Sequence, residues 1–253
     1  ETGVWVDAVL GDWIEGVTLH EAAAEAALAR DTAKLRSLAE SFDALAAGMI
    51  ADDCAHGDLK PANIIVDRER KLHPIDFDAT FLPAFAGEAS PELGTAAYQH
   101  PARTAADFNE RLDDYPAALI STGLHALAED PTFWDRYGTT DGLLFSPREI
   151  PGDPAYREAL ALFERRGRAV QYRVAQLLCA PSLQLFGLAE LLREAVRQAG
   201  EQQPATDEST PDLFVENGRW GYRTPQRIVI PPLYDSGFDF TEGLAAVLLG
   251  GTW

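Results

Sequence analysis

The spacing of apolar side chains over most of the chain is typical of amphipathic helices. It predicts a first helix over residues 19–29 and a second helix that begins at Asp31 or Thr32. Apolar residues on the second helix recur at three- and four-residue steps, which define one buried face: Leu35, Leu38, Phe42, Leu45 and Met49. Further apolar stripes predict one helix after Asp113 and two or three helices within residues 156–197.

Two other stretches have the pattern of strands. Residues 64–66 are β-branched and apolar, residues 67–70 are polar and turn-like, and residues 72–77 form the returning strand of a predicted hairpin. Residues 200–212 are polar, rich in acids and contain prolines, which predicts a flexible linker. Residues 213–253 then become β-rich. The sequence therefore predicts an α+β chain with a mainly helical domain, a small hairpin and a β-rich C-terminal segment.

Composition and charge narrow the possible partners. The chain has 253 residues, of which 46% are hydrophobic and 24% charged, and its net charge of −19 disfavours binding to nucleic acids and anionic membranes. No apolar run approaches the ~20 residues needed to cross a bilayer, and no signal peptide is visible. Cys54 and Cys179 lack metal-ligand spacing, so we expect buried, reduced thiols and a cytoplasmic location.

Several polar residues gather around the predicted hairpin. His56, Asp58, Lys60 and Asn63 precede its first strand, and Asp76 lies near the end of its second. A hairpin of this length brings Asp76 back beside Asn63, with Asp58 at the mouth of the same loop. The result is an oxygen-rich site suited to a divalent cation, with one acidic group left to face a substrate.

The order and spacing of these residues resemble the protein kinase superfamily. The run HGDLKPAN, completed by Asp76 and a phenylalanine, is similar to the kinase pattern H-x-D-x-K-x-x-x-N followed by D-F-G. The resemblance implies that Asp58 is the catalytic base and that Asn63 and Asp76 bind Mg²⁺. It also implies that Lys60 contacts a phosphate of ATP and that Ile65 floors the adenine pocket.

The same resemblance assigns parts of a kinase fold to the chain. Residues 1–16 would be the end of the N-lobe and the hinge, where Asp12, Trp13 and Ile14 would lie against the adenine of ATP, and residues 17–199 would be the helical C-lobe. The glycine-rich loop, the phosphate-clamping lysine and its glutamate partner have no counterparts upstream of the hinge. We therefore expect a fragment cut at both ends, which by itself binds nucleotide poorly.

A second motif extends the resemblance beyond the hairpin. Residues 94–101, GTAAYQHP, are similar to the G-T-x-x-Y-x-x-P that closes the activation segment of protein kinases. The similarity implies that Thr95 contacts the catalytic aspartate and lysine. Asp113 matches the buried aspartate that holds the catalytic loop in kinases. Asp114 is the alternative for that role, and a plain helix N-cap is a third interpretation.

Three positions depart from the kinase pattern. Gly57 stands where many kinases have arginine, so a phosphate on the activation segment would lack its usual docking partner, and phosphorylation there is not the expected switch. Asp78 replaces the glycine of D-F-G, a feature that also occurs in small-molecule kinases. Ala102 replaces a glutamate that forms a structural salt bridge in the family.

The C-terminal segment contains an internal repeat. A shift of 33 residues superposes Trp253 on Trp220 and Gly251 on Gly218. The motifs W-G-Y, I-P-P-x-Y-D and F-x-E-G-L-A-x-V resemble the WG repeat of bacterial proteins. The resemblance implies that residues 213–253, an incomplete array, bind a partner or substrate, whereas a β-hairpin appendage without a binding role is the alternative.

The sequence thus predicts an ATP- and Mg²⁺-dependent phosphotransferase of the Ser/Thr protein kinase type, which transfers the γ-phosphoryl group to a protein hydroxyl. Two alternatives stay open. A small-molecule kinase of the aminoglycoside or choline type is disfavoured by Lys60 and by residues 94–101. A pseudokinase scaffold that only presents the repeats is disfavoured by the complete set of acidic and metal-binding positions.

Overall fold

The computed structural model describes residues 13–140, 142–202, 211–224, 228–240 and 244–252. The chain divides into two compact units, Glu1–Gly200 and Glu201–Trp253. The described residues form seven α-helices and three small antiparallel sheets, so the predicted α+β class is confirmed. Within these residues no helix combines the length and the apolar character needed to cross a membrane. Most of the predicted end of the N-lobe and hinge, residues 1–12 of 1–16, lies outside the described residues.

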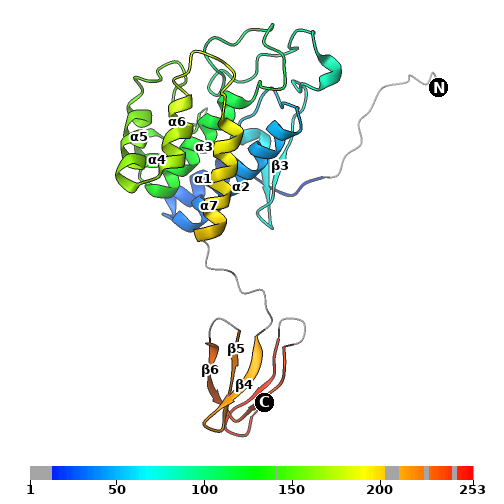
Figure 1. Ribbon diagram of the computed structural model, residues 1–253, viewed down its shortest axis with the longest axis vertical. Helices are drawn as coiled ribbons and strands as arrows, with labels where there is room; N and C mark the ends of the chain where they lie inside the picture. The colour runs from blue at the N-terminus through cyan, green and yellow to red at the C-terminus, as the bar shows by residue number, and fades with distance from the viewer. Residues whose placement is uncertain (1–12, 141, 203–210, 225–227, 241–243, 253) are drawn as a thin grey trace, which may run out of the picture. The chain divides into compact units, whose positions relative to one another are not determined.

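The first unit is a helical bundle with one three-stranded sheet (Figure 1). Its helices are α1 (Leu19–Leu28), α2 (Thr32–Ala51), α3 (Asp114–Glu129), α4 (Phe133–Tyr137), α5 (Pro154–Arg166), α6 (Ala169–Leu177) and α7 (Leu188–Gln202). Its sheet has the order β1 (Gly16–Thr18), β2 (Ile64–Asp67) and β3 (Leu72–Pro74). Two short 3₁₀ turns, η1 (Pro61–Asn63) and η2 (Pro83–Phe85), lie in the loops.

Local capping explains where the first two helices begin. The Thr18 hydroxyl accepts a hydrogen bond from the Glu21 amide, and the Glu21 carboxylate accepts one from the Thr18 amide, which completes a capping box. The Asp31 carboxylate accepts the amide of Lys34, so Asp31 is the N-cap of α2. The predicted stripe on α2 faces the main core, although Leu45 and Met49 are only partly buried.

Helix α3 is the centre of the core. Almost all of its residues are buried, and it packs against α2, α5 and α6. The stripe predicted on α7, which includes Leu188 and Leu192, is buried in the same core. Cys54 is half-buried and Cys179 is exposed, so the expectation that both are buried is wrong, and neither forms a disulfide.

A buried carboxylate joins α2 to α3. The Asp43 side chain, on α2, accepts a hydrogen bond of 2.6 Å from the Ser121 hydroxyl and contacts the His125 Nε2 atom at 2.8 Å. Both partners belong to α3, and Asp43 is only 1% exposed. Because a buried carboxylate is stable only with such partners, this cluster fixes how the two helices pack.

The Asp43 cluster gives a first prediction. In Asp43→Ala, the Ser121 hydroxyl and the His125 ring lose their common acceptor inside the core, so we expect the free energy of unfolding to fall by about 3 kcal/mol. Urea denaturation followed by far-UV circular dichroism measures the change. Asp52→Ala removes an exposed aspartate just after α2 and should alter stability by only about 0.5 kcal/mol. Equal effects of the two substitutions would contradict the assignment.

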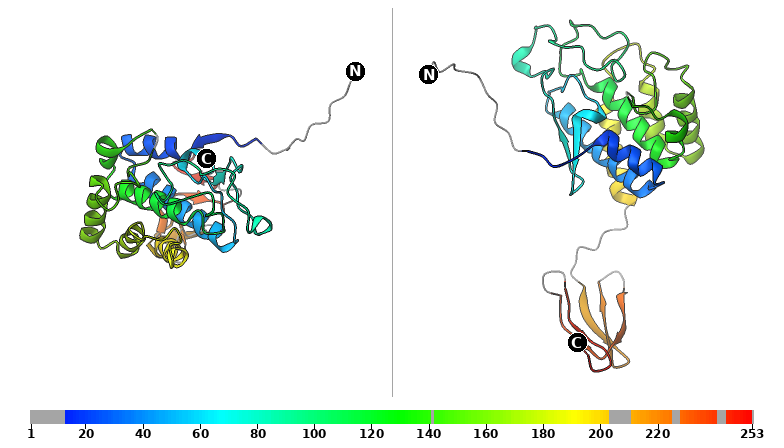
Figure 2. Two further views of the ribbon diagram at one scale, coloured as in Figure 1. Left: turned by 90° about the horizontal axis from the view of Figure 1, so that it is seen from above. Right: turned by 180° about the vertical axis from the view of Figure 1, so that it is seen from behind.

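The sheet of the first unit forms the predicted hairpin and adds one strand. β2 pairs with both β1 and β3, with Ile65 opposite Thr18 on one side and His73 on the other. β2 lies against α1, and β3 lies against α2 (Figure 2). The returning strand was predicted to reach Phe77 but ends at Pro74. Proline has no amide hydrogen to donate, and Asp76 has a left-handed φ of +68°, so the chain leaves the sheet here.

After the end of α7, the regular elements in the described residues of the second unit are β-strands, in agreement with the predicted β-rich C-terminal segment. Its strands β4 (Asp212–Glu216), β5 (Arg219–Arg223) and β6 (Ile228–Tyr234) form a meander, and β7 (Ser236–Gly237) pairs with β8 (Val247–Leu248). Tyr222 is fully buried, donates its hydroxyl to the Phe238 carbonyl at 2.8 Å and contacts the ring of Phe240. Most of the predicted linker and Trp253 lie outside the described residues.

Candidate active site

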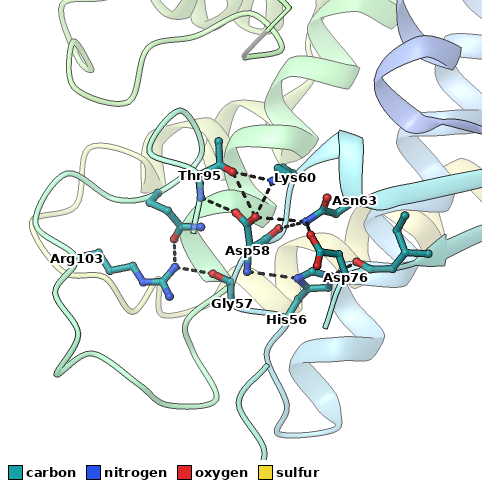
Figure 3. Close-up of polar contacts among 10 residues, drawn as sticks. His56, Gly57, Asp58, Lys60, Asn63, Asp76, Thr95 and Arg103 are labelled. Carbon is teal, nitrogen blue, oxygen red and sulfur yellow. Dashed lines mark hydrogen bonds and ion pairs between the residues drawn. The ribbon is translucent and has the colours of Figure 1, made fainter. Parts of the chain in front are cut away.

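Three separate segments of the first unit bring the predicted site residues together (Figure 3). Asp58 and Lys60 lie in the loop between α2 and η1, and Asn63 is the last residue of η1. Asp76 follows β3, and Thr95 belongs to the long loop that leads to α3. All five side chains are joined by hydrogen bonds, so the catalytic and metal-binding residues predicted from the sequence form one polar cluster.

The Asp58 carboxylate is the centre of this cluster. It accepts a hydrogen bond of 2.7 Å from Lys60 Nζ and one of 2.5 Å from the Thr95 amide. Lys60 Nζ also donates to the Thr95 hydroxyl at 2.9 Å, so the three residues form a closed triangle. Burial raises the pKa of Asp58, but the hydrogen bonds from Lys60 and Thr95 outweigh it, and the pKa lies below its usual range. The carboxylate is therefore ionised at neutral pH.

Asn63 connects Asp58 to Asp76. Its amide nitrogen donates to the Asp58 carbonyl at 3.1 Å and to the Asp76 carboxylate at 3.3 Å. Asn63 is buried, whereas Asp76 is exposed, so the cluster opens to solvent on the side of Asp76. The left-handed backbone of Asp76 is strained for a residue with a Cβ, and such strain is frequent at functional sites.

The His56 ring connects the backbone of Ile75, next to Asp76, to the loop that carries Asp58. Its Nδ1 atom accepts the Asp58 amide at 3.3 Å, so the proton of the neutral ring lies on Nε2, which faces the Ile75 carbonyl at 2.8 Å. The Ile75 amide in turn donates to the Asn63 carbonyl at 2.9 Å. These bonds hold the residue before Asp76 against the loop that carries Asp58.

Asp113 anchors the same loop through its backbone. The Asp113 carboxylate accepts the amides of His56 and Gly57, the latter at 3.0 Å, and it forms no N-cap bond to α3. Burial raises the pKa of Asp113 despite these two bonds. Asp114 instead binds Arg111 and the Leu185 amide, and burial raises its pKa to about 6. Of the three interpretations left open by the sequence, the contacts agree with Asp113 as the residue that holds the loop.

Two glycines are required where the loops meet. Gly57 has a φ of +81°, and a Cβ atom there would lie 2.0 Å from the Ala79 carbonyl oxygen. Gly94 has a φ of +69°, and its Cβ would lie 2.7 Å from the Gly57 carbonyl oxygen. Such contacts are far inside van der Waals distance, so no larger residue fits without displacing the backbone. Gly57 therefore has no room for the arginine that stands at this position in the kinase pattern.

The predicted adenine-binding residues are not part of the cluster. Trp13 is 90% exposed and Ile14 is half-buried, and no described contact joins either residue to Asp58. Ile65 is the residue after Ile64 at the start of β2, close to Asn63 in the sequence. Its side chain is partly exposed. Asp12 lies outside the described residues. The adenine-binding role of these four residues stays a prediction.

The metal-binding prediction depends on the donor atoms of Asn63 and Asp76. Among the described residues, no group of three or more histidine, cysteine, aspartate or glutamate side chains could hold a metal by itself. Mg²⁺, however, is commonly bound by one or two protein oxygens together with substrate phosphates and water. The Asp76 carboxylate and the Asn63 amide, which can turn its oxygen towards the ion, fit that mode of binding. These two groups are too few to hold the ion without substrate phosphates and water.

The sequence interpretation missed Arg103. Its guanidinium donates to the Gly57 carbonyl at 2.7 Å and to the Gln99 side-chain oxygen at 2.5 Å, beside the cluster (Figure 3). One signal was available, because Arg103 is the only lysine or arginine within residues 72–110. Its target is a backbone carbonyl far away in the sequence, and residue patterns do not reveal such partners.

The comparisons with known proteins concern the second unit. A family model described as WG containing repeat matches residues 226–253, so the C-terminal part of the predicted resemblance is confirmed. The match begins after Trp220 and Gly221 and does not include the Asp58 cluster. No curated protein matches the chain.

Proposed function

We propose that the first unit is the catalytic part of an ATP-dependent phosphotransferase of the Ser/Thr protein kinase type. The observation that supports this proposal is the hydrogen-bonded convergence of Asp58, Lys60, Asn63, Asp76 and Thr95 from three separate chain segments. A chance set of polar residues on a surface hairpin has no reason to meet around one buried carboxylate. The order of the residues along the chain is the one found in the kinase template.

Asp58 is the residue that we propose orients the acceptor hydroxyl. Its carboxylate is ionised and held from two sides by Lys60 and Thr95, so its orientation is fixed before a substrate arrives. The lowered pKa makes it a weak base. It therefore takes the hydroxyl proton only as the bond to phosphorus forms and the acidity of that hydroxyl rises.

In this proposal, the negative charge of the phosphates is neutralised by Lys60 and by a Mg²⁺ ion that Asn63 and Asp76 would hold. Lys60 already spans Asp58 and Thr95, and its ammonium group would stabilise negative charge that develops on the transferred phosphoryl group. Asn63 and Asp76 would hold Mg²⁺, which supplies the positive charge that the ATP phosphates need. The carboxylates of Asp58, Asp76 and Asp113 outnumber the cations Lys60 and Arg103, so a triphosphate would be repelled without such an ion.

The second unit suggests how a substrate is recruited. A WG repeat at residues 226–253 belongs to an array type in which neighbouring units together form a binding surface. We propose that this surface binds a protein partner or the protein acceptor itself. The Lys60–Thr95 contact favours a protein acceptor over a sugar or aminoglycoside, because the resemblance to protein kinases includes the segment around Thr95.

The proposal is tested with Asp76→Asn in the full-length protein. Loss of the metal-binding carboxylate should lower phosphotransfer from radiolabelled Mg-ATP by about 10²- to 10³-fold and weaken Mg-ATP binding measured by calorimetry. Asp52→Asn, which removes an exposed carboxylate a few residues before Asp58 that takes no part in the hydrogen bonds of the cluster, should leave both unchanged. A panel of protein, sugar and aminoglycoside acceptors identifies the substrate class. Failure of the wild-type protein to bind Mg-ATP would favour a scaffold without catalysis.

A further inference from the structure

Arg103 connects the catalytic loop to both sides of the segment that carries Thr95. One terminal nitrogen donates to the Gly57 carbonyl, and also to the Gln99 side chain after Thr95. The other donates to the Ser90 hydroxyl at 3.4 Å and to the Glu92 carbonyl at 3.3 Å, both before Thr95. A planar guanidinium with donors in a fixed fork is the side chain best suited to four acceptors in different directions.

Three acceptors of Arg103, on Ser90, Glu92 and Gln99, lie before and after Thr95 in one segment of the chain. The segment from Ser90 to Gln99 has no helix or strand that would hold it in place. Within it, the Thr95 amide donates the 2.5 Å hydrogen bond that fixes the Asp58 carboxylate. Since Arg103 binds the segment on both sides of Thr95, it restricts how far this amide can move away from Asp58.

The two peptide groups on either side of the Gly57 Cα atom are held by charged residues of opposite sign. The Gly57 amide donates to the Asp113 carboxylate at 3.0 Å, and the Gly57 carbonyl accepts from Arg103 at 2.7 Å. Asp113 binds the loop from the side of α3, whereas Arg103 binds it from the long loop. The backbone on both sides of Gly57 is therefore held, one peptide group from α3 and the next from the long loop.

We propose that Arg103 is a positioning residue that assembles the site without phosphorylation of the loop. The proposal rests on the proposed function and deepens it. In this chain Gly57 leaves no room for an arginine on the catalytic loop that could receive a phosphate. Arg103 instead brings its guanidinium to this loop from the long loop before α3. Its partners are carbonyl, hydroxyl and amide oxygens of the unmodified chain. Thr95 and Asp58 are thus held together constitutively.

Hydrogen exchange tests the positioning role in the chain itself, without reference to activity. In Arg103→Gln, amides of residues 90–99 should exchange at least about tenfold faster than in the wild type, while α2 and α3 keep their protection. Arg165→Gln, which removes an exposed arginine at the end of α5, should leave exchange in residues 90–99 unchanged. Unchanged exchange in Arg103→Gln would overturn the proposal. Faster exchange throughout the unit would also overturn it, because it would indicate a general role in stability.

Kinetics in the full-length protein then separate positioning from substrate binding. Arg103→Gln should lower kcat by about 10- to 100-fold and leave the KM for ATP nearly unchanged, since a small displacement of Asp58 reduces the reaction more than binding. Arg103→Lys should restore little of the rate, because one ammonium cannot reach both sides of Thr95. Added guanidinium ion should recover part of the rate of the glutamine variant. Normal kcat in either variant would overturn the proposal.

Phosphatase treatment tests the independence from phosphorylation. The wild-type protein should keep its rate after treatment, and a loss of activity that returns on rephosphorylation would contradict the proposal. A further combination of results separates the two proposals. If the wild type transfers no phosphate to any acceptor but Arg103→Gln still exposes residues 90–99 to exchange, the proposed function fails while the structural role of Arg103 stands.

Discussion

Asp58→Asn is expected to lower phosphotransfer by the full-length protein by about 10³-fold or more, with little change in the KM for ATP. Asparagine has nearly the same shape as aspartate and can still accept the hydrogen bond from the Thr95 amide. It has no negative charge and cannot take up the proton of the acceptor hydroxyl. The substitution therefore removes the reaction step that we propose for Asp58 and preserves the loop geometry.

Two controls make this prediction specific. Urea denaturation should show that Asp58→Asn lowers the free energy of unfolding by about 2 kcal/mol, because Lys60 loses the charged partner of a mostly buried ion pair but keeps the Thr95 hydroxyl. Asp52→Asn should keep the wild-type rate, since Asp52 is an exposed residue outside the cluster. Unchanged turnover in Asp58→Asn would refute the assignment of Asp58, and equal turnover losses in both variants would show that a general charge effect is responsible.

Gly57→Ala is expected to be the most damaging small substitution in the first unit. The new Cβ would lie 2.0 Å from the Ala79 carbonyl oxygen, and neither atom belongs to a flexible side chain that could move aside. The left-handed backbone alone costs an alanine about 1 kcal/mol, and the forced displacement of the backbone adds about 1–3 kcal/mol. Because the Gly57 amide is bound by Asp113 and the Gly57 carbonyl by Arg103, the displacement also breaks those contacts.

Gly87→Ala is the matched control for this effect. Gly87 has a φ of +91°, similar to that of Gly57, but a Cβ atom there would meet nothing within 4 Å. Its substitution should therefore report the conformational cost alone, about 1 kcal/mol. Urea denaturation of the two variants gives the difference, which we expect to be about 2 kcal/mol or larger. Equal losses of stability would show that the loop at Gly57 is looser than the contact distances indicate.

The sequence predicted those parts of the first unit that depend on local rules. Apolar spacing and capping residues are local features of the sequence. They were therefore sufficient to predict the start of α1 after its N-cap Thr18 and the buried face of α2. The cluster around Asp58 was predicted for a different reason. Its members are separated by fixed short intervals along one loop and one hairpin, so the order of residues is enough to bring Asp58, Asn63 and Asp76 together.

Features that depend on distant partners could not be predicted in the same way. The role of Asp113 was one of three possibilities, because only the packing of α3 brings its carboxylate to the His56 and Gly57 amides. Arg103 was missed since its partners include a backbone carbonyl, and carbonyls are present at every residue. The end of β3 was misjudged because the apolar pattern continues to Phe77, whereas the left-handed backbone of Asp76 ends the pairing.

The second unit has one steric feature with a consequence for how repeats of this kind vary. A Cβ atom on Gly221 would lie 2.6 Å from the Ile230 carbonyl oxygen and 2.8 Å from backbone atoms of Pro231 and Pro232. The tryptophan–glycine pair and the isoleucine–proline–proline run are therefore in direct backbone contact, and each limits the size of the other. A larger residue in place of the glycine requires the isoleucine–proline–proline backbone to move away. We therefore expect the two motifs to change together from one repeat to another, and not one at a time.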